Sequence, residues 1–143
     1  MPFYPHYPEE PKSERDWFEA LTALARYLRG PDGCPWDRVQ GPAEFAGFLQ
    51  DETEELVEAF ASGDHAHAAE ELGDVFFNLL ATAAAAEEEG RFQLEDALRG
   101  IHEKMIRRHE HVFGDAKAET PEHATEIWNA VKAREKKGGG KKR

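Results

Sequence analysis

The sequence has little cysteine and no long apolar run. Cys34 is the single cysteine among 143 residues, so no internal disulfide can form. The longest apolar stretch, residues 75–86, is interrupted by Asn78 and Thr82 and is shorter than the roughly 18 residues that a bilayer span requires. Residues 1–11 contain prolines and acids where a signal peptide needs an apolar segment. We therefore expect a cytoplasmic protein without a membrane segment.

Positive charge is also scarce. The chain has 18 Lys and Arg against 29 Asp and Glu, which gives a net charge of −11. A nucleic-acid duplex or an anionic membrane would repel such a chain at long range, so neither is expected as its main partner. The length fits one domain. We assign it to residues 13–136, preceded by an N-terminal extension, residues 1–12, and followed by a flexible basic tail, residues 137–143.

Strand signals are absent as well. No segment alternates β-branched residues with period two, and there is no internal repeat or nucleotide-binding glycine motif. Apolar residues recur at helical spacing instead, which predicts an all-α fold. The first of five expected helices is capped by Ser13 and ends at Gly30, and the last begins at Thr120 and Pro121. The other three cover residues 43–61, 65–89 and 94–109.

The connections between these helices complete the predicted fold. Residues 30–42 are rich in glycine and proline, so we expect a rigid loop that carries Trp36 and Asp37. The tight break at residues 62–64 predicts an antiparallel hairpin of the second and third helices. Because broad apolar stripes need covering, we expect a helical bundle built on this hairpin and completed by oligomerisation, as a homodimer or homotetramer.

Four carboxylates lie in two pairs on the hairpin. Glu52 and Glu55 are three residues apart, and so are Glu71 and Asp74. At 3.6 residues per turn, each pair projects from one face of its helix. The chain reverses almost midway between Glu55 and Glu71, so the two pairs should lie level on neighbouring helices. Carboxylate oxygens are the ligands that hard divalent cations prefer, which predicts an Mg²⁺ site.

The surroundings of these acids favour a buried role. Glu52 falls on an apolar stripe that would otherwise be the buried seam of its helix, and Asp74 directly precedes the apolar residues 75–77. Burying an unpaired charge costs several kcal/mol, so acids at such positions normally meet a cation. Spacing alone leaves a second interpretation open. In so acidic a sequence such pairs are common, and these four can equally be solvated helix surface.

Basic residues follow on the fourth helix, at Lys104, Arg107 and Arg108. Cations beside a carboxylate-bound Mg²⁺ are the usual parts of sites for phosphoryl chemistry. The alternative is a basic surface patch that pairs with acids elsewhere. Three nearby histidines lack partners at ligand spacing and are interpreted as surface or packing residues. They are His102, His109 and His111.

Four motifs occur in a characteristic order over roughly residues 17–135. They are Gly-Cys-Pro-Trp-Asp at 33–37, Asp-Glu-Thr-Glu-Glu at 51–55 with Glu-Leu-Gly-Asp at 71–74, Arg-Arg-His-Glu-His-Val-Phe-Gly at 107–114, and Trp128 followed by Lys132. Together they resemble the motifs of MazG-type nucleoside triphosphate pyrophosphohydrolases. Two positions depart from the family pattern. Asp51 replaces a glutamate, and Gly41 follows Gln40 where a hydroxyl residue is usual.

The resemblance implies an all-α oligomer that hydrolyses an NTP or dNTP to the monophosphate and pyrophosphate, as house-cleaning of the nucleotide pool. By that analogy the residues that hold Mg²⁺, for which Mn²⁺ can substitute, are Glu52, Glu55, Glu71 and Asp74. The residues expected to contact the substrate are Lys104, Arg107, Arg108, Trp128, Asn78 and Trp36. Trp128 can equally anchor the last helix to the core, and Asn78 can be a satisfied core amide.

The expected mechanism is attack by a metal-activated water on the α-phosphorus, with pyrophosphate leaving. Asp51 or Glu54 is expected to take the proton, and Glu55 is placed with them among the catalytic residues. Three rival functions remain open at this point. One is a related pyrophosphohydrolase with a narrower substrate, such as dCTP, dUTP or phosphoribosyl-ATP. The others are a non-catalytic helical oligomer that binds metal or nucleotide and a purely structural helical oligomer, although a scaffold has no reason to place acids in apolar stripes.

Overall fold

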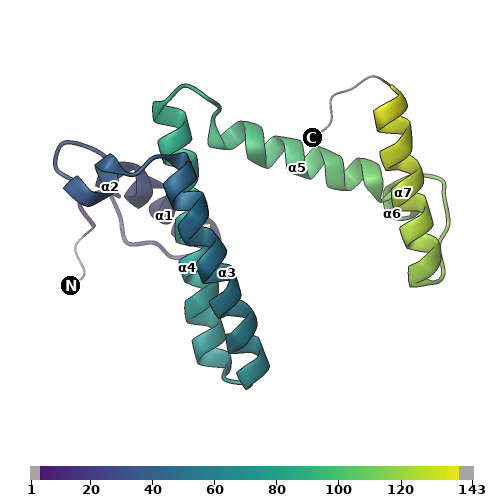
Figure 1. The fold of residues 1–143 in the computed structure, drawn as a ribbon, viewed down its shortest axis with the longest axis horizontal. Coiled ribbons are helices and arrows are strands. Elements are labelled where there is room, and N and C mark those ends of the chain that lie inside the picture. The colour runs from purple at the N-terminus through teal and green to yellow at the C-terminus, as the bar shows by residue number, and fades with distance from the viewer. Residues whose placement is uncertain (1–3, 139–143) are drawn as a thin grey trace. The chain divides into compact units, whose positions relative to one another are not determined.

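The computed structural model describes residues 4–138, and the regular structure within that range is entirely helical (Figure 1). This confirms the all-α prediction. No helix within residues 4–138 combines the length and the apolar character needed to cross a membrane. The chain divides into two compact units, of which the first ends at Leu94 and the second begins at Glu95.

Helix α1 (Glu14–Leu28) opens the regular structure of the first unit. Ser13 caps it as predicted, because the Ser13 hydroxyl accepts a hydrogen bond from the backbone N–H of Asp16 at 3.1 Å. The described part of the N-terminal extension packs on this helix, where the Tyr7 hydroxyl donates to Glu19 at 2.8 Å. Residues 1–3 of that predicted extension lie outside the described residues.

A short helix, α2 (Pro35–Val39), interrupts the segment that was predicted to be an irregular loop. That prediction was wrong for these five residues. Proline in the first turn of a helix needs no N–H partner, and its fixed φ suits the helix, so Pro35 starts α2 rather than preventing it. Before α2 the chain folds back on α1 so tightly that a Cβ at Gly33 would lie 2.2 Å from the Leu28 carbonyl oxygen. Glycine at this position therefore allows the close return that places α2.

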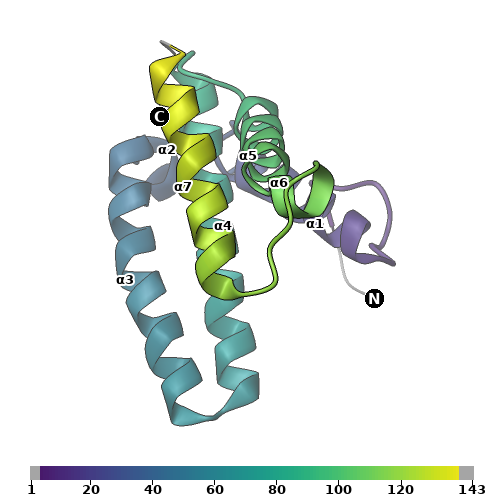
Figure 2. The same cartoon turned by 90° about the vertical axis from the view of Figure 1, so that its right-hand side faces the viewer.

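Helices α3 (Pro42–Ser62) and α4 (His65–Glu88) lie side by side, and both views of the fold show the pair (Figures 1 and 2). Gly63 ends α3 with a left-handed φ of 79°, which glycine adopts without strain. Asp64 then caps α4 by accepting a hydrogen bond from the backbone N–H of His67 at 3.1 Å. Because the turn is this short, the two helices run antiparallel.

Helix α4 is the central element of the first unit, since both α3 and α1 pack against it. One buried cluster joins Phe45 of α3 to Ala81 and Ala85 of α4. A second joins Ala25 of α1 to Leu80. The small alanine side chains allow close approach of the helices, and both clusters lie in the part of α4 remote from the turn. The acidic residues lie nearer the turn, between α3 and α4.

The second unit contains α5 (Leu94–Arg108), the short α6 (Glu110–Phe113) and α7 (Pro121–Lys137). Thr120 caps α7 as predicted, by accepting a hydrogen bond from the backbone N–H of His123 at 3.1 Å. The Glu135 carboxylate of α7 pairs with two arginines of α5, which ties the ends of these helices together. Lys137 ends α7, and the predicted flexible tail beyond residue 138 lies outside the described residues.

Candidate metal centre

Three carboxylates converge between α3 and α4. Glu52 and Glu55 of α3 and Glu71 of α4 each offer an oxygen, and these three oxygens lie within 4.8 Å of one another. Glu71 is 7% exposed, and Glu52 is partly buried. The i, i+3 spacing on α3 and the central turn thus produce the convergence that the sequence predicted.

Asp74, the fourth predicted acid, is not part of that compact trio but contributes to the same negative field. Burial raises the pKa of the Glu52 carboxyl, and the neighbouring charges of Glu55, Asp74 and Glu71 raise it further. Like charges gathered in a partly buried space favour the protonated acid. A bound cation reverses this preference, because it offsets the repulsion that the carboxylates otherwise exert on one another.

Two carboxylate oxygens of the trio are buried and have no hydrogen-bond partner within residues 4–138, namely Oε2 of Glu52 and Oε1 of Glu71. Buried polar atoms in proteins are normally hydrogen bonded, and leaving one unpaired is costly. The other Glu71 oxygen, Oε2, is engaged, because His67 Nε2 donates to it at 3.0 Å. A trio of converging carboxylates, two of which carry an unpaired buried oxygen, fits a hard divalent cation, which takes oxygen ligands.

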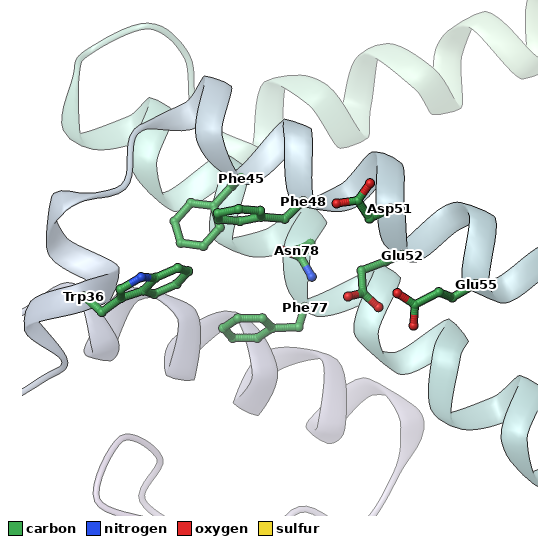
Figure 3. A pocket seen from close by; sticks show the side chains of 8 residues that line it. All are labelled: Trp36, Phe45, Phe48, Asp51, Glu52, Glu55, Phe77 and Asn78. Atoms are coloured by element: carbon green, nitrogen blue, oxygen red, sulfur yellow. The ribbon is translucent and has the colours of Figure 1, made fainter.

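A cavity of about 380 Å³ adjoins the carboxylates (Figure 3). The carboxylates of Glu52 and Glu55 point toward each other at one side, and aromatic rings form the other side. Trp36 stacks on Phe48 with ring centroids 5.6 Å apart and an interplanar angle of 23°. The lining residues are Trp36, Phe45, Phe48, Asp51, Glu52, Glu55, Phe77 and Asn78. The cavity therefore joins an acidic wall to an aromatic wall.

Arg29 holds the aromatic wall in place through α2. Its side chain is 6% exposed, and its Nη1 donates to the Asp37 carbonyl oxygen at 2.6 Å. The same guanidinium pairs with Glu88 and lies over the Phe45 ring, 5.9 Å from the ring centroid. One buried cation thus links α1, α2, α3 and α4. Because Trp36 belongs to α2, this linkage fixes the position of its ring at the cavity.

The structure separates the three residues that the sequence offered as catalytic. All three are exposed, but Asp51 and Glu55 line the cavity, whereas Glu54 is not among the lining residues. Glu54 lies two positions after Glu52, so it projects from roughly the opposite side of α3. Asn78 lines the cavity as well, and its Nδ2 donates to the Asp74 carbonyl oxygen at 2.9 Å, which leaves its own side-chain oxygen as an acceptor.

The predicted phosphate-binding residues make their described contacts within the second unit. Arg108 donates to Glu135 at 2.8 Å, and Arg107 pairs with the same carboxylate. The Arg108 guanidinium also lies over the Trp128 ring, 5.1 Å from the ring centroid. Lys104, the third predicted cation, is partly buried. Pairing of the arginines with an acid agrees with the alternative that the sequence left open, and it also keeps two cations side by side.

A second cavity, of about 430 Å³, lies beside Trp128 in the second unit. Its lining residues are His109, His111, Ala124, Thr125, Trp128 and Asn129. The His109 ring meets Trp128 edge to face with centroids 5.6 Å apart, and it lies 5.4 Å from the His111 ring. His102 is exposed. His109 is therefore a packing residue, and Trp128 serves both as a wall of this cavity and as a contact between helices.

Sequence reasoning missed several residues around the carboxylates. Phe45, Phe48 and Phe77 line the cavity, yet their spacing on apolar stripes indicates only core packing. Glu135 and Arg29 act through contacts distant in sequence, for which spacing gives no signal. The His67 contact did have a detectable signal, because His67 precedes Glu71 by four residues and such pairs face each other on a helix.

The comparisons with known proteins agree with this geometry. The profile of the MazG nucleotide pyrophosphohydrolase domain matches residues 40–113, which include all four acids and the basic segment. The chain therefore belongs to the MazG nucleotide pyrophosphohydrolase family.

Individual relatives give the extent of the likeness. The chain is 41% identical over 126 residues to the nucleoside triphosphate pyrophosphohydrolase/pyrophosphatase MazG of Thermotoga maritima, a match that covers 88% of this chain and 47% of that protein. It is 38% identical over 119 residues to the nucleoside triphosphate pyrophosphohydrolase of Escherichia coli K12, covering 82% of this chain and 45% of that protein. The chain thus spans about half the length of these curated relatives.

A solved structure shares the fold. The crystal structure of a mazG-related protein from Thermotoga maritima superposes with a TM-score of 0.68 at 32% sequence identity. The match covers 80% of this chain and 98% of that one. The helical arrangement around the carboxylates is therefore that of a MazG-related protein.

Proposed function

We propose that this chain catalyses the Mg²⁺-dependent hydrolysis of nucleoside triphosphates, NTP or dNTP, to the nucleoside monophosphate and pyrophosphate. The observation that carries the proposal is the convergence of Glu52, Glu55 and Glu71 within 4.8 Å beside a cavity with an aromatic wall. Membership of the MazG family supports it, as do the names of the relatives from Thermotoga maritima and Escherichia coli. The activity is assigned to residues 13–136.

Glu52, Glu55 and Glu71, together with Asp74, are the residues that would hold Mg²⁺, with Mn²⁺ as a substitute. The unpaired buried oxygens of Glu52 and Glu71 are the reason for this choice. A bound divalent ion lowers the pKa of a coordinated water and offsets negative charge on phosphate oxygens. Asp51 lines the same cavity without belonging to the compact trio, so it is proposed as the proton acceptor, with Glu54 as the alternative.

The aromatic wall is the proposed position of the base. Trp36 is 54% exposed although it stacks on Phe48, so a face or edge of its indole remains available to a planar ligand. Stacking accepts any base, because every base has a π-face. The free side-chain acceptor of Asn78 adds a polar contact for a base or sugar. These features suit a nucleotide whose phosphates extend toward the carboxylates.

Lys104, Arg107 and Arg108 are proposed to neutralise the triphosphate, with Trp128 as a further contact of the nucleotide. A site built from acids alone would repel an anionic substrate, so cations are required somewhere near the phosphates. The two arginines meet that requirement most simply, because Glu135 offsets only one of their two charges.

The exposed apolar side chains of α3 and α4 support a homo-oligomer, either a dimer or a tetramer. Val57 and Phe60 of α3 are 64% and 63% exposed, and three large apolar residues of α4 are also exposed. The latter are Leu72, Phe76 and Leu79. Exposed apolar residues that follow helical spacing on adjoining helices favour contact with another chain. We propose house-cleaning of the cytoplasmic nucleotide pool as the role of the assembly.

The test is a panel of NTPs, dNTPs and phosphoribosyl-ATP incubated with Mg²⁺, with the products separated by ion-exchange chromatography. Monophosphate and pyrophosphate are the expected first products, formed in equal amounts and abolished by EDTA. Diphosphate and orthophosphate as first products would overturn the assignment. Turnover confined to one nucleotide identifies a narrow-specificity enzyme, such as one for dCTP, dUTP or phosphoribosyl-ATP. Binding of metal or nucleotide without turnover identifies the non-catalytic alternative.

A further inference from the structure

His67 contacts one oxygen of Glu71 and leaves the other free. Its Nε2–H donates to Glu71 Oε2 at 3.0 Å, because an ionised carboxylate can only accept. Glu71 Oε1 is buried and has no hydrogen-bond partner in the part of the chain that the structure describes. The two oxygens of this carboxylate therefore differ in their hydrogen bonding. One is tied to a side chain one helical turn away, and the other is unpaired among the described residues, in a carboxylate that belongs to the trio with Glu52 and Glu55.

The backbone that carries His67 is itself fixed. His67 lies in the first turn of α4, and its N–H donates to the capping carboxylate of Asp64 at 3.1 Å. The preceding Gly63 sets the turn with a φ that other residues rarely adopt. The imidazole thus projects from an anchored position and reaches forward to Glu71 at i+4, where side chains on one helix face meet.

We propose that His67 is a positioning residue for the metal centre. It holds the Glu71 carboxylate so that Oε1 is presented to the cation. The inference rests on the proposed function only in that Glu71 is taken as a metal ligand. His67 is assigned orientation rather than coordination, because its nitrogens do not belong to the trio of mutually close ligand atoms. Partners that orient ligating carboxylates typically change metal affinity by about 10–100-fold when they are removed.

The test measures Mn²⁺ binding to the full chain by the loss of the free-ion EPR signal, without nucleotide. His67→Phe keeps a ring and removes the donor, so the dissociation constant for Mn²⁺ should rise about tenfold or more. His67→Gln retains an N–H donor at the same spacing and should restore most of the affinity. The matched control is His65→Phe, an exposed position on the same turn of α4, which should bind Mn²⁺ like the wild type.

Several outcomes would overturn the inference. Unchanged or tighter Mn²⁺ binding by His67→Phe, even with a lower melting temperature, would leave His67 with a structural role only. A nitrogen coupling from His67 in the electron spin echo of bound Mn²⁺ would make it a ligand. Absence of Mn²⁺ binding by the wild type would remove the centre and the inference together.

A kinetic readout separates this inference from the proposed function. In the His67→Phe variant the Mg²⁺ concentration for half-maximal rate should rise about tenfold, while kcat at saturating Mg²⁺ stays near the wild-type value. A fall in kcat with unchanged Mg²⁺ dependence would contradict positioning. Wild-type protein that binds Mn²⁺ but releases no pyrophosphate would overturn the proposed function, and the EPR comparison would still decide the role of His67.

Discussion

Glu52 on α3 and Glu71 on α4 each bury one carboxylate oxygen that has no hydrogen-bond partner among the described residues, and both belong to the same trio of converging acids. A helical scaffold gains nothing from such an arrangement, because each unpaired buried oxygen costs free energy. Where two helices contribute one such atom each, a ligand between them is the simplest physical reason. We therefore expect substitution of either glutamate to change both metal binding and the stability of the metal-free protein.

Glu71→Ala should reduce pyrophosphate release by about a hundredfold or more, because loss of a metal ligand removes several kcal/mol of charge stabilisation in the transition state. The measurement is kcat/KM at saturating Mg²⁺, together with a circular dichroism spectrum to show that the helices remain. Glu70→Ala is the control, since Glu70 is the adjacent exposed acid of α4. Equal activity of the two variants would remove Glu71 from the metal centre.

Glu52→Gln should stabilise the metal-free protein at neutral pH while weakening its response to Mg²⁺. Burial first, and neighbouring acids second, raise the pKa of Glu52, so folding opposes its ionisation. A raised folded-state pKa gives stability that is present below the unfolded value of about 4.5 and lost as the pH rises through the folded value. The advantage of the Gln variant should therefore be largest near pH 7 and vanish in acid.

Urea unfolding in EDTA at pH 7 and at about pH 4 measures that difference between Glu52→Gln and the wild type. Adding Mg²⁺ at 100 times its dissociation constant should stabilise the wild type by about 2.7 kcal/mol and the variant by much less. A variant that is less stable than the wild type in EDTA at neutral pH would show that the Glu52 carboxylate is not under electrostatic stress.

Trp36→Ala should raise KM for the nucleotide on the order of tenfold, because stacking of one base on an aromatic ring contributes about 1–3 kcal/mol. Trp36→Phe keeps an aromatic face and should recover most of this loss. The Trp36 ring belongs to the cavity wall, whereas Trp17 of α1 is similarly exposed but packs on Tyr4. Trp17→Ala is therefore the control, and an equal rise in KM in both alanine variants would contradict the assignment.

Glu135→Gln should weaken the junction of α5 and α7 at neutral pH but not in strong acid. Hydrogen bonds from Arg108 and Arg107 lower the pKa of Glu135 to about 2. A lowered folded-state pKa gives stability that is present above the unfolded value of about 4.5 and lost as the pH falls toward 2. The unfolding midpoints of variant and wild type should therefore differ at pH 7 and converge only as the pH falls to about 2. A constant difference across this range would contradict the prediction.

The helices and the acids could be predicted because both depend on local spacing. Ser13 and Thr120 cap the starts of their helices with side-chain oxygens, and Gly63 ends α3 with a left-handed φ. These residue types favour such positions, so they can be recognised in the sequence. The meeting of Glu55 and Glu71 follows from the turn midway between them. The assignment of ligands and of substrate contacts remains a prediction, since geometry alone does not test it.

The remainder of the site depends on contacts between residues of different helices. The stacking of Trp36 on Phe48 joins two elements, and the link of Arg108 to Glu135 joins helices that are separated by a loop. Spacing along one helix cannot indicate such pairs. The α2 helix was missed because the glycine and proline content of residues 30–42 argues against regular structure, although Pro35 in the first turn favours helix formation.

Arg29 controls the position of α2, and with it the Trp36 ring, without being one of the carboxylates of the trio. Its guanidinium holds α2 from the end of α1, a helix that supplies no acid to the trio. An exchange there would shift the indole of Trp36 while leaving the cation ligands untouched. Selection among nucleotides and the cleavage chemistry could then evolve independently in this lineage, through substitutions in separate helices.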